Sequence, residues 1–172
     1  MSERLRVFLL VAAFVASLAA LFGMQHVKEI RSETPSRMPE IALKNGGTLD
    51  SAVKGVAVVA IWGTWCPPCL SDHPVLMDMA KRGVRIVGVP VGDDELTVRE
   101  WLSKKGNPYS ELLFAGERIQ GGIPLTLVVS DGRVVDGQRG GLSESDADRL
   151  SSAWMKAGGK ASGADAALGK KD

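Results

Sequence analysis

Residues 56–69 of this chain read VAVVAIWGTWCPPC, an uninterrupted apolar run followed by two cysteines that are separated by two prolines. The apolar run predicts a strand that is buried on both faces of a sheet, and the prolines suit the first turn of a helix. A CxxC motif between a buried strand and a helix is typical of redox-active dithiols. The chain has no other cysteine, so Cys66 and Cys69 carry any thiol chemistry that it performs.

The predicted positions of the two thiols give each a different role. Cys66 lies where the helix begins, and the unpaired backbone N–H groups there stabilise a thiolate and lower the pKa of the thiol. We therefore expect Cys66 to be the nucleophile of disulfide exchange. Cys69, one turn into the helix, is placed to resolve the mixed disulfide by intramolecular attack. Pro67 and Pro68 fix the backbone and keep the pair rigid.

Two other interpretations of the cysteine pair fit the sequence less well. A structural zinc site usually needs four ligands, and only His26 and His73 could complete one. A purely structural disulfide across two intervening residues closes a very short loop, so it removes little entropy from the unfolded chain. Redox activity is the interpretation that the local sequence favours, and we expect no metal site.

The N-terminus predicts export from the cytoplasm. Val7–Met24 is an 18-residue stretch without a charge, preceded by Arg4 and Arg6. This length suits a membrane-spanning helix, and the positive flank places the N-terminus in the cytoplasm and the rest of the chain outside. A cleavable signal peptide is the alternative, with residues 17–19 as the cleavage site, but its apolar core is normally shorter. Either way, the CxxC motif works where disulfides persist.

Composition divides the chain into four parts. We predict a membrane anchor at 1–24, a polar tether at 25–37, one domain at 38–158 and a disordered tail at 159–172. The domain has about 120 residues, a common domain size, whereas the tail has too little apolar surface to order itself. A formal net charge of +1 without a basic cluster argues against a nucleic-acid partner.

Within the domain, strand and helix patterns alternate. We predict strands at 56–62, 84–91, 125–129 and 134–136, and helices at 68–82, 95–105 and 144–156. Gly106 is a helix stop signal, Asp131-Gly132 is a hairpin turn, and Ser143 with Asp146 forms a partial capping box. These elements predict an α/β fold, with a central mixed sheet and helices on both faces.

The order of elements and the placement of CxxC resemble the thioredoxin fold. Several stretches more closely resemble the exported, membrane-anchored CcmG/DsbE group that serves cytochrome c maturation: WGTWCP at 62–67, VGV at 87–89, GDD at 92–94, and WL at 101–102 leading to GNPY at 106–109. The resemblance covers about residues 38–150. It implies a reductant in the periplasm, anchored in a bacterial inner membrane. Its electrons would come from a transmembrane thiol donor and pass to oxidised apocytochrome c or its maturation proteins, with no cofactor beyond the redox-active disulfide.

The resemblance also implies a substrate-binding surface. Pro124, just before the third predicted strand, corresponds to the cis-proline of the thioredoxin fold that faces the dithiol. Ile123 and Pro124, together with Trp65, Pro67 and Pro68, are then expected to contact the substrate chain. Without the resemblance, an ordinary trans proline at a strand edge is the better interpretation of Pro124.

Asp72 is a candidate proton carrier. It lies three residues after Cys69, so both side chains share one face of the helix, and a carboxylate there can take or deliver the proton of the resolving thiol. A solvated first-turn Asp, favoured by the helix dipole, explains the position equally well. The resemblance favours the proton role, although the family usually has the longer Glu here. The chain departs from the family further at Leu125, where a Glu is typical, and in a shortened segment at 110–123.

Three other functions fit the sequence less well than reduction of disulfides. Disulfide-introducing oxidases often have a His between their cysteines, but Pro67 and Pro68 supply no such donor. Copper metallochaperones on this fold use CxxxC and a distal histidine, and no histidine follows His73 here. A peroxiredoxin would have its Thr three residues before the cysteine, whereas Thr64 lies two residues before Cys66. We expect His73 on the helix surface, and Trp62, Trp101 and Trp154 in packing positions.

Overall fold

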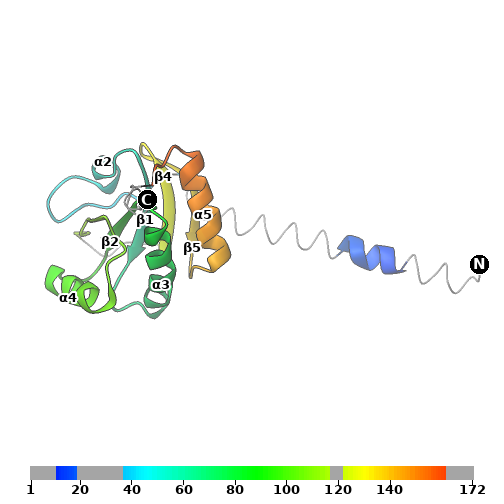
Figure 1. Ribbon diagram of the computed structural model, residues 1–172, viewed down its shortest axis with the longest axis horizontal. Coiled ribbons are helices and arrows are strands. Elements are labelled where there is room, and N and C mark those ends of the chain that lie inside the picture. Colours follow the sequence, from blue (N-terminus) through cyan, green and yellow to red (C-terminus); the bar gives the residue numbers. More distant parts are fainter. Residues whose placement is uncertain (1–10, 19–36, 117–121, 162–172) are drawn as a thin grey trace, which may run out of the picture. The chain divides into compact units, whose positions relative to one another are not determined.

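The computed structural model describes residues 11–18, 37–116 and 122–161 (Figure 1). By its contacts the chain forms two compact units, Met1–Thr34 and Pro35–Asp172, and the cysteine motif lies in the second. A helix occupies residues 11–18 of the first unit. No helix within the described ranges is long and apolar enough to cross a membrane.

Several predicted segments extend beyond the described residues. The predicted span Val7–Met24 is described only in part, as are the tether at 25–37 and the tail at 159–172. His26 also lies outside the described residues. The anchor, the tether and the tail therefore stay predictions.

The second unit is built on a five-stranded mixed sheet. Its strands are β1 (Val56–Trp62), β2 (Ile86–Pro90), β3 (Glu111–Leu112), β4 (Leu125–Ser130) and β5 (Arg133–Arg139). Their order across the sheet is β3-β2-β1-β4-β5. β1 pairs in parallel with β2 and antiparallel with β4, and the β4–β5 hairpin completes the sheet. The mixed sheet that the sequence predicts is confirmed.

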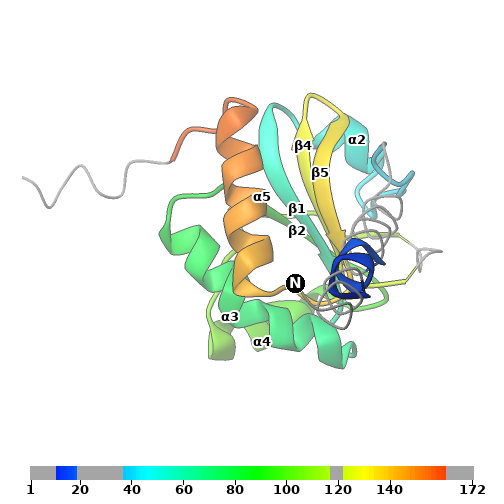
Figure 2. The ribbon, with the colours of Figure 1, turned by 90° about the vertical axis from the view of Figure 1, so that its right-hand side faces the viewer.

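Helices cover both faces of this sheet. They are α2 (Leu49–Ala52), α3 (Pro67–Lys81), α4 (Glu95–Lys105) and α5 (Glu144–Lys156). Helices α3 and α5 lie on one face and α2 on the other (Figure 2). The dithiol helix α3 begins one residue earlier than the sequence predicts, and α4 has the predicted bounds.

Two hydrophobic cores explain the uninterrupted apolar run of β1. Alternate side chains of a strand point to opposite faces. Val58 and Ala60 pack into the core beneath α3, which also contains both cysteines, whereas Val59 and Ile61 pack into the core on the opposite face. A half-exposed strand has a polar residue at every second position. β1 lacks this alternation because both faces of the sheet are covered.

The predicted turn and cap residues act where the sequence places them. Asp131 and Gly132 have φ of 46° and 80° and form the tight turn between β4 and β5, as Asp-Gly hairpins require. Gly106, with φ of 92°, ends α4. Ser143 and Asp146 form a complete capping box at the start of α5.

Two short elements were not predicted. Helix α2 has four residues and strand β3 has two, which is too short for either to show a periodic pattern. Strand β3 extends the sheet by pairing in parallel with β2. It occupies the start of the shortened segment at 110–123, of which residues 117–121 are not described.

The first described residue of the second unit joins the sheet at its edge. Arg37 forms an antiparallel bridge with Arg133, at the start of β5. The register of β4 pairs Ser130 with both Arg133 and Val56, so this bridge lies at the end of the sheet where β1 begins. The cysteines follow Trp62 and therefore lie beyond the opposite end of β1.

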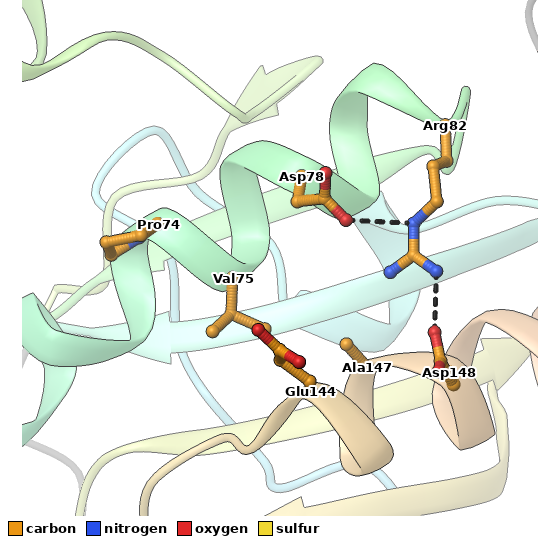
Figure 3. A pocket seen from close by; sticks show the side chains of 7 residues that line it. All are labelled: Pro74, Val75, Asp78, Arg82, Glu144, Ala147 and Asp148. Carbon is orange, nitrogen blue, oxygen red and sulfur yellow. Dashed lines mark hydrogen bonds and ion pairs between the residues drawn. The ribbon is translucent and has the colours of Figure 1, made fainter.

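A groove of about 410 Å³ lies between α3 and α5 (Figure 3). Val75 and Ala147 are among the apolar residues that line it. Arg82 reaches from the end of α3 and pairs with Asp78 at 3.2 Å and with Asp148 of α5 at 2.7 Å. The exposed pair of Arg82 with Asp148 links the two helices. None of the residues that line the groove is a predicted site residue.

Candidate active site

The two cysteines form a disulfide at the N-terminus of α3. Cys66 is the N-cap residue, and the backbone N–H of Cys69 donates to its Sγ at 3.3 Å. On reduction the same N–H and the helix dipole stabilise a thiolate at Cys66. Both residues are buried, with 4% and 3% of their surface exposed, so exposure does not distinguish nucleophile from resolving thiol. Their positions distinguish them, because Cys66 is the N-cap of α3 and Cys69 lies within the helix.

The predicted substrate-contacting residues differ in exposure. Pro67 and Pro68 are exposed, and Trp65 has 51% of its surface exposed. Ile123 is half-buried and Pro124 is buried at the start of β4. The Ile123–Pro124 peptide bond is cis, which agrees with the prediction. The roles of these five residues in substrate binding stay predictions.

The loop between β1 and α3 is tied to the loop between β2 and α4. Trp65 Nε1 donates to the carbonyl of Val91 at 2.9 Å. The backbone N–H and the hydroxyl of Thr64 both donate to the carboxylate of Asp93, each at 2.7 Å. Sequence reasoning did not identify the Thr64–Asp93 contact. The sequence marks only the acidic pair Asp93-Asp94 shortly after a buried strand, and this pair does not identify Thr64 as the partner.

Gly63 is required by the same loop. A Cβ atom added to Gly63 would lie 2.7 Å from Nε1 and 2.9 Å from Cε2 of Trp65. The indole therefore folds back over Gly63, and the Val91 carbonyl holds it there. The tryptophan next to Cys66 is thus fixed in position although half of its surface is exposed.

Asp72 is buried rather than solvated, so the alternative of a solvated first-turn residue is wrong. Only 4% of its surface is exposed. Its Oδ1 accepts the backbone N–H of Leu142 at 2.7 Å, whereas Oδ2 has no hydrogen-bond partner. Burial raises the pKa of Asp72 above its usual value, which the hydrogen bond from Leu142 partly offsets. Both Cys69 and Asp72 are among the buried residues of α3, as a shared helix face requires, and the proton role stays a prediction.

Three aromatic side chains pack together in the core that also contains the two cysteines. The ring of Tyr109 stacks on Trp62, with centroids 5.4 Å apart, and Trp62 also contacts Trp101 at 5.4 Å. Burial, and then the charge of Asp72, raise the pKa of Tyr109 far above its usual range. Trp62 and Trp154 are buried, so their predicted packing positions are confirmed. In the sequence, Tyr109 is part of the GNPY stretch at 106–109, but no packing role is predicted for it.

The prediction that His73 lies on the helix surface is wrong. Only 7% of His73 is exposed. Its Nε2 lies 3.3 Å from the carbonyl of Lys105, and its ring meets Trp101 edge-on with centroids 4.6 Å apart. Helix α3 packs against α4 on this side and against the start of α5 on the side of Asp72, so its buried arc is wide.

Burial lowers the pKa of His73, so the imidazole is held neutral. Within the described ranges, no group of three His, Cys, Asp or Glu side chains could hold a metal ion. His73 therefore packs as a neutral aromatic ring between α3 and α4.

Comparison with known proteins finds relatives named for thiol–disulfide exchange. A family model described as Redoxin matches residues 34–117. The thiol:disulfide interchange protein DsbE of Vibrio cholerae is 30% identical over 149 residues, which cover 74% of this chain and 80% of that protein. The DsbE protein of Pseudomonas aeruginosa is 45% identical over a shorter stretch of 53 residues, 31% of this chain and 29% of that protein.

Solved structures agree on the fold. A thioredoxin-family thiol:disulfide interchange protein from Chlorobium tepidum TLS is 25% identical and superposes with a TM-score of 0.52, over 71% of this chain and 96% of that one. A putative DsbE from Chlorobium tepidum, 19% identical, has a TM-score of 0.54 over 72% of this chain and 96% of that one. The second unit is therefore a thioredoxin-like domain.

Proposed function

The chain belongs to the DsbE group of thiol:disulfide oxidoreductases, and we propose that it works in this group as a reductant of protein disulfides in cytochrome c maturation. The observation that carries the direction is the pair of prolines between the cysteines. Pro67 and Pro68 offer a Cys66 thiolate neither an N–H nor a side-chain donor. A less stabilised thiolate makes the dithiol form a better electron donor, because strong oxidants are those whose reduced form is stabilised.

Reduction proceeds by two exchanges. The Cys66 thiolate attacks one sulfur of the substrate disulfide, the substrate S–S bond breaks, and the leaving thiolate takes a proton. Cys69 then gives up its proton and attacks Cys66 Sγ. This step forms the Cys66–Cys69 disulfide that the structure contains and releases the second substrate thiol. Two electrons have passed to the substrate, and we propose that Asp72 takes the proton of Cys69.

The proposed setting is a bacterial inner membrane. The uncharged segment Val7–Met24 supports a single-pass anchor, with the thioredoxin-like domain in the periplasm. A transmembrane thiol protein would return the disulfide to its dithiol form. Apocytochrome c or the proteins that handle it would be the substrates, and no cofactor beyond the dithiol is needed.

The reduction potential against glutathione tests this proposal. We expect a value nearer to about −270 mV, typical of thioredoxin, than to about −120 mV, typical of the strong oxidant DsbA. The reduced chain should also reduce a peptide with an oxidised Cys-x-x-Cys-His motif, the haem attachment sequence of c-type cytochromes. A potential near that of DsbA would favour the alternative function, an oxidase that introduces disulfides.

A further inference from the structure

The loop that carries Cys66 is held by a single carboxylate from another part of the chain. Thr64, two residues before Cys66, donates its backbone N–H to Asp93 Oδ2 and its hydroxyl to Asp93 Oδ1, each at 2.7 Å. Both carboxylate oxygens are therefore engaged by one residue. Hydrogen bonds to a charged acceptor are stronger than neutral ones, and this pair is partly buried.

Asp93 itself is fixed in place. Lys44 Nζ donates to its backbone carbonyl at 2.9 Å. Two residues earlier, the N–H of Val91 donates to the carbonyl of Trp62, and the Val91 carbonyl accepts Trp65 Nε1, both at 2.9 Å. The segment from Val91 to Asp93 thus contacts the loop on both sides of Thr64. A fixed acceptor positions its donor more accurately than a flexible one.

The chemistry of the carboxylate matches what Thr64 offers. Thr64 presents two donors, and an ionised carboxylate is an acceptor at both oxygens. An amide at position 93 would replace one of these acceptors with an NH₂ donor, so the Thr64 hydroxyl could no longer donate there and would have to accept instead. The remaining hydrogen bonds would be neutral rather than charge-assisted, and therefore weaker. The contact therefore favours Asp at 93 for a reason other than capping the helix, because the N-cap of α4 is the neighbouring Asp94.

We propose that Asp93 is a positioning residue for the nucleophile. Acting through Thr64, it holds the loop Gly63–Trp65 so that Cys66 and the indole of Trp65 keep one arrangement in both the disulfide and the dithiol state. Asp93 does not touch the reacting sulfurs. The proposal concerns the exchange chemistry in either direction, so it does not depend on whether the chain acts as a reductant.

The test compares Asp93→Asn with Asp94→Asn in the full chain. Both variants remove one negative charge at adjacent positions, and Asn keeps the N-cap role of residue 94. The rate of attack of the reduced chain on 4,4′-dithiodipyridine is measured from pH 6.5 to pH 9, where this disulfide is uncharged. We expect Asp93→Asn to lower the plateau rate constant at full thiolate ionisation by about tenfold or more, since a displacement of 1 Å can cost about a hundredfold. Asp94→Asn should stay within about twofold of the wild type.

A second pair of variants tests the other side of the contact. Thr64→Ser keeps both donors and should retain the wild-type rate, whereas Thr64→Val removes the hydroxyl and should be slowed about as much as Asp93→Asn. The double variant Thr64→Val/Asp93→Asn should be no slower than the slower single variant, because the two residues act as one unit. Hydrogen exchange of the Thr64 amide should speed up in Asp93→Asn and not in Asp94→Asn. If Asp93→Asn does not fold, the two Thr64 variants decide the question alone.

Three results would overturn the proposal. The first is a wild-type plateau rate in Asp93→Asn. The second is a change confined to the midpoint of the pH profile, which would show that Asp93 acts through its charge. The third is equal slowing by Asp93→Asn and Asp94→Asn. The reduction potential is measured separately, so a failure of the proposed direction and a failure of Asp93 give different outcomes.

Discussion

Burial without a full set of hydrogen-bond partners raises the pKa of a carboxyl group. Asp72 lies on the active-site helix with Oδ1 bonded to the backbone of Leu142 and Oδ2 unpartnered. The pKa of Asp72 is raised because burial destabilises the ionised form relative to the protonated form. The proposed transfer of the Cys69 proton to Asp72 rests on this raised pKa and on the shared helix face.

We predict that Asp72→Asn slows the second exchange step. Asn cannot accept a proton, so the attack of Cys69 on a preformed Cys66 mixed disulfide should slow by about a hundredfold, the lower range for general-base catalysis. In the wild type the rate should rise as the pH rises through the raised pKa of Asp72, and this rise should vanish in the variant. Release of the second thiol is measured between pH 4 and pH 8.

The matched control for Asp72→Asn is Asp78→Asn. Asp78 is on the same helix, but it is exposed and paired with Arg82, so its loss should leave the rate unchanged. The first attack by Cys66 should change little in either variant. An unaltered rate and pH profile in Asp72→Asn would make Asp72 a structural residue.

We predict that Cys69→Ser traps mixed disulfides with substrate and that Cys66→Ser traps few. The two sulfurs are almost equally buried, so only Cys66's place at the N-cap, where the helix N–H groups stabilise a thiolate, separates them. Trapped adducts are counted by non-reducing electrophoresis and located by mass spectrometry after incubation with an oxidised peptide. Equal trapping by both variants would contradict the assignment.

The cysteine pair could be predicted from the sequence because its signal is local: a buried strand, two cysteines and a helix in direct succession. The Thr64–Asp93 contact could not. Its residues are separated by 29 positions and meet only because Trp62 pairs with Pro90 in neighbouring parallel strands. The burial of His73 was missed for a related reason, since it depends on the packing of α3 against α4.

At the scale of the element, helix α5 shows what a cap contributes. Ser143 Oγ accepts the N–H of Asp146 at 3.2 Å, and Asp146 Oδ2 accepts the N–H of Ser143 at 3.0 Å. This reciprocal pair satisfies two donors that would otherwise lack partners. The helix then places Leu150 and Trp154 against the sheet, where both are fully buried.

We predict that Ser143→Ala destabilises the fold by about 1 kcal/mol, the usual cost of losing an N-cap side chain. The midpoint of thermal unfolding should fall by about 2–4 °C. Ser143→Asp keeps an acceptor at the cap and should remain close to the wild type. Calorimetry of the three proteins checks this, and a loss in Ser143→Asp equal to that in Ser143→Ala would argue against the capping role.

Among the elements, β1 and α4 have the bounds that the sequence predicts, because each has a long pattern and a clear stop signal. Strand β2 is shorter than its apolar run, and β5 extends three residues beyond its predicted end. Neither α2 nor β3 could be predicted, since such short segments take their structure from the sheet that they pack against. Their signals are tertiary rather than local.

At the scale of the whole molecule, the same Asp72 opposes stability. Because its pKa in the folded state is raised above 3.8, the folded chain binds this proton more tightly than the unfolded chain does. The free energy of unfolding therefore falls as the pH rises from about 4 through the raised pKa, and the loss persists at neutral pH. The proposed proton role and the stability of the fold place opposite demands on this residue.

We predict that Asp72→Asn raises the free energy of unfolding at pH 7 by about 1 kcal/mol, since an unpartnered buried charge costs more than an unpartnered neutral group. The gain should shrink toward zero near pH 3, where Asp72 is protonated in the folded wild type as well. Urea unfolding at several pH values measures it. A gain that does not depend on pH would show that burial of the charge is not its cause.

The first described residue of the domain and the cysteines lie at opposite ends of the sheet. Arg37 meets Arg133 where β1 begins, and the cysteines follow the last residue of β1. The first described residue of the domain and the reactive sulfurs are therefore separated by the length of a seven-residue strand, about 20 Å. A protein fused ahead of Arg37 would therefore join the domain at the end of the sheet away from the dithiol, and would leave the cysteines free to meet large and incompletely folded protein chains.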